Sequence, residues 1–487
     1  MNNWRGAACL TFALGSTFLA TGAQATNGYF LPGFGLRSQG MGGVGVAIGG
    51  DSLSQAANPA NLVGMGMRGD FGVTLFNPVR HAKVYDRDQG DGVGDFGFSG
   101  DEESDDELFP MPEMGFSMPI DSRWTVGFAM VGAGGMNTTY RKNLFASKLN
   151  SINNIINSPF IGLGAGASAK VDSDLGVDLM QVLLPLSVAF KVNEEHAVGA
   201  SLVLAAQRFR AYGLKNFYNF SQPILVTAFG TPISSDPATL THNQFDWSFG
   251  AGVKLGWQGD FFDDRLTLGA TYASRTYMTK FKLYKGLFAE QGDFDIPSNW
   301  GIGLTLRPTK DWTLAFDINR INYSEVASVH NLGPDQYPSL SGIQTSTARC
   351  TPTDCDGLTN YNALTGADGG MGFGWKSITV YKWGLSHDVN DQWTVRTGYN
   401  YSKSPIADDQ LTFNILAPAT TEQHYSAGFT YRSKESPMEI TGTYMYAAAR
   451  EQSSCGNNIV DCVAIGMHQN FLGLSFSWVL DPPSRHN

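Results

Sequence analysis

The sequence has little charge, few cysteines and only one long apolar run, and each scarcity excludes a class of protein. Asp, Glu, Lys and Arg make up 16% of the 487 residues and sum to a formal net charge of −11. Nucleic acid is not an expected partner, because binding the phosphate backbone needs a positive surface. Beyond the N-terminus, no stretch approaches the roughly 18 apolar residues of a membrane helix.

The apolar run at the N-terminus has the pattern of a secretory signal peptide. Arg5 supplies the positive end, residues 7–20 are apolar, and Ala23-Gln24-Ala25 matches an A-x-A cleavage site. A short buried helix is the alternative, but the position of the cleavage site favours a signal. We therefore expect residues 1–25 to be removed and the mature chain to begin at Thr26.

The few cysteines fall into two close pairs once Cys9 leaves with the signal peptide. Cys350 lies near Cys355, and Cys455 lies near Cys462. In an exported chain this spacing predicts two local disulfides. A zinc site is the less favoured alternative because no histidine lies beside either pair, so we predict no metal.

Period-two alternation of large apolar residues with small or polar ones dominates the chain after Arg68. Residues 247–257 and 472–478 show it clearly, with tryptophan at the ends of the strands. Aromatic residues at strand ends are typical of the interface girdles of membrane barrels. The pattern predicts an all-β protein that spans a membrane; a secreted soluble β protein is the alternative.

The connections between the predicted strands are of two kinds that alternate without exception. Six are short polar turns and seven are longer loops, as an even-stranded outer-membrane barrel requires. We therefore predict a 14-stranded antiparallel transmembrane β-barrel over residues 66–480, in the bacterial outer membrane, followed by a tail at 481–487. The predicted strands are 68–84, 108–121, 123–136, 176–192, 195–211, 244–259, 264–280, 294–308, 311–326, 376–389, 391–404, 421–434, 436–448 and 468–480.

Residues 26–65 are rich in glycine, nearly free of charge and too few to build a core of their own. We expect them to form a hatch, or plug, in the barrel lumen, anchored at Asn58-Pro59-Ala60. Residues 40–45 fit G-x-G-x-x-G, but a dinucleotide site needs a strand before this motif and a helix after it. No other motif indicates a cofactor or a catalytic group, so we expect a protein that is not an enzyme.

Several short motifs, in the same order, resemble the FadL family of outer-membrane transporters for long-chain fatty acids and other hydrophobic compounds. The resemblance covers nearly the whole mature chain. It implies a fourteen-stranded barrel, a lumen hatch, and a third strand whose kink opens a lateral gap into the membrane. The matching residues are the glycine-rich 33–62 with Asn58-Pro59-Ala60, Pro119-Ile120-Asp121, Gly134-Gly135, Thr139-Tyr140, Tyr272-Ala273-Ser274-Arg275, Ile296-Pro297, Arg396-Thr397-Gly398-Tyr399 and Ser404-Pro405.

The resemblance places further candidate sites. The kink falls on the tract that contains Gly132, Gly134 and Gly135, since glycine weakens strand pairing and permits a bulge; an ordinary strand end is the alternative. Two outer loops carry apolar residues that would capture the ligand, or pack together as a lid. These residues are Phe145, Leu149, Ile152 and Ile156 in one loop, and Ile224, Leu225 and Phe229 in the other.

A carboxylate ligand in the lumen would need a basic group at the end of an apolar pocket. The candidates are Arg208, Arg210, Lys215 and Arg396. Each could instead form a structural pair, for example with Asp317. The acidic loop at 86–107 would be a solvated surface or would bridge cations to lipopolysaccharide.

Together these features predict a monomeric channel that passes hydrophobic molecules inward, most simply long-chain fatty acids. The steps are capture by the loops, binding in the lumen, movement of the hatch and lateral exit at the kinked third strand. Uptake of an aromatic or alkane hydrocarbon is one alternative. A non-transporting barrel that acts as an adhesin or phage receptor is another.

Overall fold

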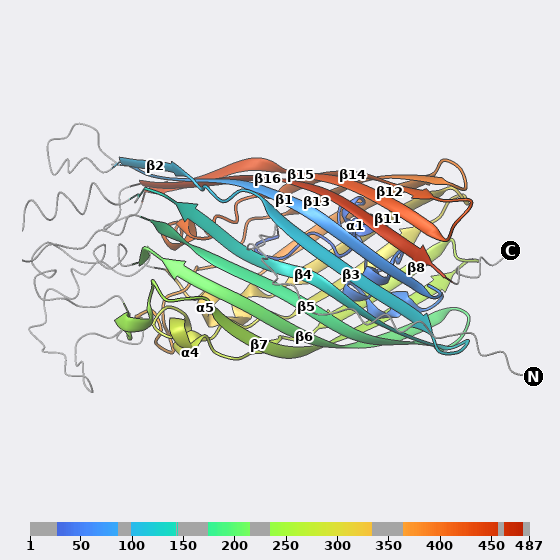
Figure 1. The fold of residues 1–487 in the computed structure, drawn as a ribbon, viewed down its shortest axis with the longest axis horizontal. Coiled ribbons are helices and arrows are strands. Elements are labelled where there is room, and N and C mark those ends of the chain that lie inside the picture. The colour runs from blue at the N-terminus through green and yellow to red at the C-terminus, as the bar shows by residue number, and fades with distance from the viewer. Residues whose placement is uncertain are drawn as a thin grey trace, which may run out of the picture.

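The computed structural model describes residues 27–85, 99–142, 144, 174–214, 234–333, 364–455 and 462–480. In them, one antiparallel sheet of sixteen strands closes on itself, because β1 pairs with β16 from Arg68–Val479 to Tyr85–Cys462. Two strands, β2 and β9, are short additions, so fourteen form the wall. Figure 1 shows these strands tilted side by side along the barrel, with α1 inside it.

The wall strands follow one another in sequence, each bonded to the next. Six of the connections are short turns at one end of the barrel, which fixes the opposite end as that of the long connections. The wall consists of β1 (Arg68–Tyr85), β3 (Phe109–Pro119), β4 (Trp124–Tyr140), β5 (Leu175–Lys191), β6 (His196–Tyr212), β7 (Asp246–Phe261), β8 (Leu266–Ala273), β10 (Asn299–Leu306), β11 (Trp312–Ile321), β12 (Ile378–Asp388), β13 (Trp393–Ser402), β14 (Gln423–Arg432), β15 (Met438–Cys455) and β16 (Cys462–Val479).

The remaining elements are short. Among the described residues, no helix has the length and apolar character needed to cross a membrane. These elements are α1 (Leu36–Gln39), η1 (Ser52–Ala56), η2 (Pro59–Leu62), β2 (Ser99–Glu103), η4 (Pro237–Thr239), β9 (Tyr277–Met278), η5 (Lys282–Tyr284), α4 (Ala289–Gly292), η6 (Tyr323–Glu325), α5 (Ala327–His330) and η10 (Phe413–Ile415).

The wall is inverted relative to a soluble protein, since its large apolar side chains face outward. On β16, Leu472 is 60% exposed, whereas the alternate residue Ser477 is 2% exposed. Tryptophans at the short-turn ends of β4, β11, β13 and β16 are also exposed, as an interface girdle requires. An exposed apolar belt around a polar or small-residue interior is the arrangement that a lipid bilayer stabilises.

The structure confirms the predicted fourteen-stranded barrel but moves several strand ends. β15 and β16 run to Cys455 and Cys462, which form a disulfide, so the predicted loop between them is mostly strand. The predicted strand 264–280 is divided into β8, which ends at Ala273, and β9 at Tyr277–Met278, where the pairing with β7 resumes. The second predicted disulfide, Cys350–Cys355, lies outside the described residues.

The N-terminal segment (residues 27–67) packs against the inward face of the wall. Glycines on that face let the two backbones approach closely. At Gly398 on β13, an added Cβ would lie 2.1 Å from the backbone nitrogen of Gly42. At Gly256 on β7, it would lie 1.9 Å from the side-chain oxygen of Asn58. The small residues of the inner face therefore make room for this segment.

We predict that Gly398→Ala destabilises the protein by about 1–3 kcal/mol, because the methyl group overpacks the contact with the N-terminal segment. Thermal unfolding in detergent measures the loss. Gly69→Ala is the matched control, since its nearest atom would be 3.9 Å away. Equal stability of the two variants would contradict the close packing.

Candidate functional site

The N-terminal segment contains only short helical turns, so many of its backbone groups need partners from the wall. Asp317 on β11 accepts hydrogen bonds from the backbone nitrogens of Gly45 at 2.7 Å and Val46 at 3.0 Å. Lys382 on β12 donates to the carbonyl of Gly43 at 3.1 Å. These buried, charge-assisted bonds fix the segment to one side of the barrel.

Asn58 joins the segment to itself and to the wall. Its side-chain oxygen accepts from the backbone nitrogen of Ala60 at 3.0 Å and thereby caps η2. Its side-chain nitrogen donates to the carbonyls of Val46 at 2.7 Å and Trp257 at 3.0 Å. Pro59, at the first position of η2, has no N–H to satisfy. The Asn-Pro pair is thus a buried anchor.

We predict that Asn58→Ala lowers stability by about 1–3 kcal/mol, because it removes the cap of η2 and the hydrogen bonds to the carbonyls of Val46 and Trp257. Asn390→Ala is the control: its side chain also caps a turn, with bonds of 2.9 and 3.0 Å, but that turn is exposed. Hydrogen exchange should report faster exchange of residues 27–67 only in the Asn58 variant. Unchanged exchange would show that Asn58 is no anchor.

The third wall strand, β4, is irregular at its glycines. Its register with β5 shifts between Gly132 and Gly134. Its pairing with β3 extends only as far as Met130–Met114, so the part of β4 from residue 131 to Tyr140 does not pair with β3. There the N-terminal segment takes over: Leu31 donates to the carbonyl of Ala133 at 3.2 Å.

The place that β3 leaves open is filled by a buried arginine and residues 104–106. Arg80 on β1 is 0% exposed and donates to the carbonyl of Asn137 on β4 at 2.8 Å. It also donates to the hydroxyl of Ser104 at 2.9 Å and to the carbonyl of Asp106. The wall between β1 and β4 is therefore closed here by these side-chain bonds and by two backbone bonds of 2.9 Å, from Ser104 to Arg80 and from Asp105 to Thr139, rather than by a continuous sheet.

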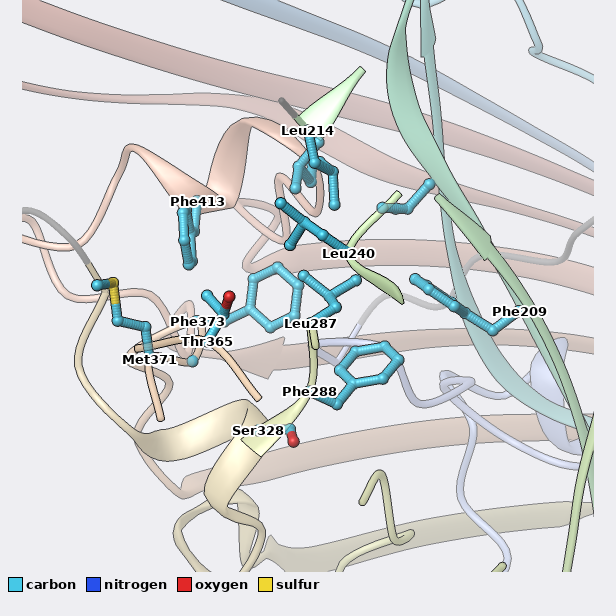
Figure 2. Close-up of a pocket in the computed structure, with 13 residues that line it drawn as sticks. Phe209, Leu214, Leu240, Leu287, Phe288, Ser328, Thr365, Met371, Phe373 and Phe413 are labelled. Atoms are coloured by element: carbon cyan, nitrogen blue, oxygen red, sulfur yellow. The ribbon is translucent and has the colours of Figure 1, made fainter. Parts of the chain in front are cut away.

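A small apolar pocket lies toward the long-connection end of the barrel (Figure 2), with a cavity volume of about 30 Å³. Wall residues of β5 and β6 form one side, and residues of the long connections form the rest. None of the described residues that line it is charged. They are Val177, Phe209, Leu214, Leu240, Leu287, Phe288, Ser328, Thr365, Met371, Gly372, Phe373, Phe413 and Leu416.

A chain of aromatic rings connects this pocket with the N-terminal segment. The ring centroids of Phe288, in the pocket, and Phe294 are 4.8 Å apart. Phe294 in turn lies 6.0 Å from Tyr29, which packs on Tyr323 at 5.2 Å. These ring contacts therefore connect the pocket to the N-terminal segment, to which Tyr29 belongs.

Two of the predicted lumen cations lie on the wrong face. Arg208 and Arg210 alternate with the buried Phe209, so they point outward with the lipid-facing Leu202 and Leu204. Arg208 pairs with Asp178 at 3.4 Å, and both guanidiniums stack on the ring of Phe245, at 4.2 and 4.6 Å. Neither arginine reaches the pocket.

Arg396 does face inward, but it lies far from the pocket residues along its strand, near the short turns. Its guanidinium donates to the hydroxyl of Thr430 at 2.8 Å. The partner considered for it, Asp317, instead accepts from the N-terminal segment. Arg396 lines a second, polar cavity, of about 180 Å³, between the N-terminal segment and the wall.

The remaining predicted site residues lie outside the described residues. They are Lys215 and the apolar capture residues Phe145, Leu149, Ile152, Ile156, Ile224, Leu225 and Phe229. Sequence reasoning also missed the pocket residues. For Phe209 a signal was available: continuing the alternation from Leu202 and Leu204 puts this phenylalanine inside and both neighbouring arginines outside.

The loop that carries Leu287 and Phe288 is held at its base by acidic residues around Arg275. The guanidinium bonds Asp295 at 2.6 Å and Asp293 at 3.2 Å. Burial, and then the nearby Asp295, raise the pKa of Asp293 from 3.8 to about 6. The folded state therefore favours the protonated form of Asp293, so its contribution to stability falls as pH rises from about 4 to about 6.

We predict that Asp293→Asn removes this fall: relative to wild type, the variant gains stability as pH rises from 4 to 6 and the gain is constant above that window. Melting temperatures across pH 4–7 measure it. Asp236→Asn is the control, because the salt bridge with Lys285 lowers the pKa of Asp236, and its window lies below 3.8. Parallel curves for wild type and Asp293→Asn would refute the assignment.

The closed wall, its lipid-facing belt and its filled lumen define an outer-membrane barrel protein. A family model described as "Outer membrane protein transport protein (OMPP1/FadL/TodX)" matches residues 167–463, more than half of the chain. The chain therefore belongs to this family of transport proteins and resides in the bacterial outer membrane.

Solved structures with the same fold cover nearly the whole chain. The toluene transporter TodX of P. putida has 16% identity and a TM-score of 0.61, covering 92% of this chain and 99% of its own. A Pseudomonas aeruginosa FadL homologue has 15% identity and 0.60, covering 93% and 100%. The Ralstonia pickettii toluene transporter TbuX has 16% and 0.58, covering 92% and 99%. No curated protein matches the sequence.

Proposed function

We propose that this protein is a passive channel for the uptake of small, uncharged hydrophobic molecules. The apolar pocket between the barrel wall and the long connections carries the proposal. On this route, outer loops capture the molecule and the pocket binds it. The N-terminal segment then shifts as a hatch, and the molecule leaves sideways at β4 into the membrane.

The character of the pocket supports an uncharged ligand. Ligand sites are generally apolar with a few polar groups that fix orientation. Here the described lining contains no cation, and its two hydroxyls, of Ser328 and Thr365, already donate to the backbone carbonyls of Asp293 and Gly286. A long-chain fatty acid, the ligand that the sequence favoured, would have to bury its carboxylate without a basic partner, which is costly. Two of the similar structures are named as toluene transporters, and toluene is likewise an uncharged hydrophobic molecule.

The present cavity of about 30 Å³ is smaller than a hydrocarbon ligand, so binding requires side chains to move. Leu287 and Met371 are partly buried members of the surrounding cluster and belong to connections rather than to wall strands. Their displacement would enlarge the cavity without breaking the sheet. The ring contacts from Phe288 through Phe294 to Tyr29 would carry this change to the hatch.

Lateral exit is supported by the local structure of the wall. An apolar molecule that leaves sideways avoids crossing a polar lumen on its way to the periplasm. β4 leaves β3 beyond Met130, and among the described residues the wall there is closed by side chains, by residues 104–106 and by the N-terminal segment. Such contacts can open at lower cost than a continuous ladder of backbone hydrogen bonds.

We predict that Leu287→Trp fills the pocket and weakens binding of a neutral hydrocarbon at least tenfold. Toluene binding to the purified full chain in detergent, measured by calorimetry, is the test. Leu472→Trp makes the same change on the lipid-facing side, where Leu472 is 60% exposed, and should bind as the wild type does. If the Leu287→Trp variant bound toluene with the affinity of the wild type, the pocket would not be part of the transport route.

The charge preference is tested separately with a matched ligand pair. Decane and decanoate differ in the carboxylate, so their relative affinity reports whether the site contains a usable cation. We expect the alkane to bind more tightly, and Leu287→Trp to weaken it. Tighter binding of decanoate, weakened by Leu287→Trp, would keep the pocket but overturn the uncharged ligand in favour of a fatty acid.

A further inference from the structure

The polar cavity lined by Arg396 differs from the apolar pocket in its position, its volume and the polarity of its lining. It lies between the N-terminal segment and the short-turn ends of β11 to β14, and it shares no lining residue with the pocket. Its volume of about 180 Å³ is enough for several water molecules and hence for a small ion. The transport route proposed above does not use it.

Positive charge prevails among the groups that line this cavity. Three arginines, Arg37 from the segment and Arg396 and Arg432 from the wall, face two aspartates, Asp51 and Asp388. Glu439, which is not among the lining residues, bonds Arg37 and Arg432 and balances part of this charge, so the preference for an anion from outside depends on an arginine that lacks a carboxylate partner.

Two of the three arginines already have carboxylate partners. Glu439 bonds Arg37 and lies 3.3 Å from Arg432, which also lies 3.8 Å from Asp388. Arg396 differs: its bond is to the hydroxyl of Thr430, and among the described residues it forms no ion pair. Arg396 is therefore the cation whose charge the surrounding protein leaves least compensated.

Hydroxyl groups surround the same space. Thr313, Ser386 and Thr394 line the wall side, and Ser38 and Ser54 line the segment side. Ser386 is the direct cross-strand partner of Arg396 on β12. The hydroxyls of Thr394 and Ser54 already donate to Asp388 and to the carbonyl of Asp51, so a tetrahedral or planar oxyanion would accept bonds from a planar guanidinium and from the hydroxyls of Thr313, Ser386 and Ser38.

We infer that this cavity is a binding site for a small oxyanion, phosphate or a short carboxylate, held by Arg396 of the wall and Arg37 of the N-terminal segment. Because its two cations come from different parts of the chain, a bound anion joins the segment to the wall. Anion binding then stabilises the closed arrangement. The inference does not depend on which molecule the channel transports.

The test is thermal unfolding of the full chain in detergent, with sodium phosphate exchanged for sodium chloride at constant ionic strength. Phosphate at about ten times its Kd should raise the melting temperature of the wild type by about 2 °C. Acetate and succinate arms distinguish a phosphate site from a carboxylate site. No rise with any of the three anions would overturn the inference.

Variants separate this site from general salt effects. Arg396→Gln should abolish the rise, whereas Arg210→Gln, on the outer face, should retain it. Ser386→Asp places a carboxylate opposite Arg396, since cross-strand Cβ atoms lie about 4.5–5.5 Å apart. It should raise the melting temperature without phosphate and cancel the response to it. A full phosphate response in Arg396→Gln or Ser386→Asp would refute the site.

Discussion

The structure depends on the requirement that every buried backbone group finds a partner. The wall meets it by closing fourteen strands into one sheet, but the N-terminal segment, with its short turns, cannot meet it alone. Wall side chains supply what is missing: Asp317 takes two backbone N–H groups, and Lys382 reaches a carbonyl. The glycines of the inner face therefore make room for this segment, and the charged side chains of the inner face bond its backbone.

Much of the fold could be predicted from the sequence, because the bilayer imposes a period of two on every strand and alternates the lengths of the connections. Strand ends were less predictable. In β15 and β16 the alternation weakens near Cys455 and Cys462, yet the strands continue, because backbone pairing needs no apolar face beyond the membrane. At β8, the pairing with β7 is interrupted after Ala273 and resumes at Tyr277 in β9, and the period-two pattern does not predict this interruption.

The candidate site was harder to predict, for two physical reasons. The pocket contains residues from connections that are far apart in sequence, such as Leu240, Leu287 and Phe413. No periodic pattern in the sequence predicts that these residues lie together. Arg208 and Arg210 were misplaced because a cation was expected in the lumen on chemical grounds. Alternation along β6 gives the opposite answer, and it agrees with the structure: Phe209 faces in and Arg210 faces out.

The N-terminal segment pairs with β4 where β3 has left it, and this has a thermodynamic consequence. Leu31 donates to Ala133, and Gly135 donates to the carbonyl of Tyr29 at 3.3 Å, so a short piece of the segment acts as the neighbouring strand. In hydrocarbon, each backbone group without a partner costs several kcal/mol. Withdrawing these residues would expose two donors and two acceptors together. Any lateral opening must therefore admit water or exchange these bonds in step, which raises the barrier to leakage.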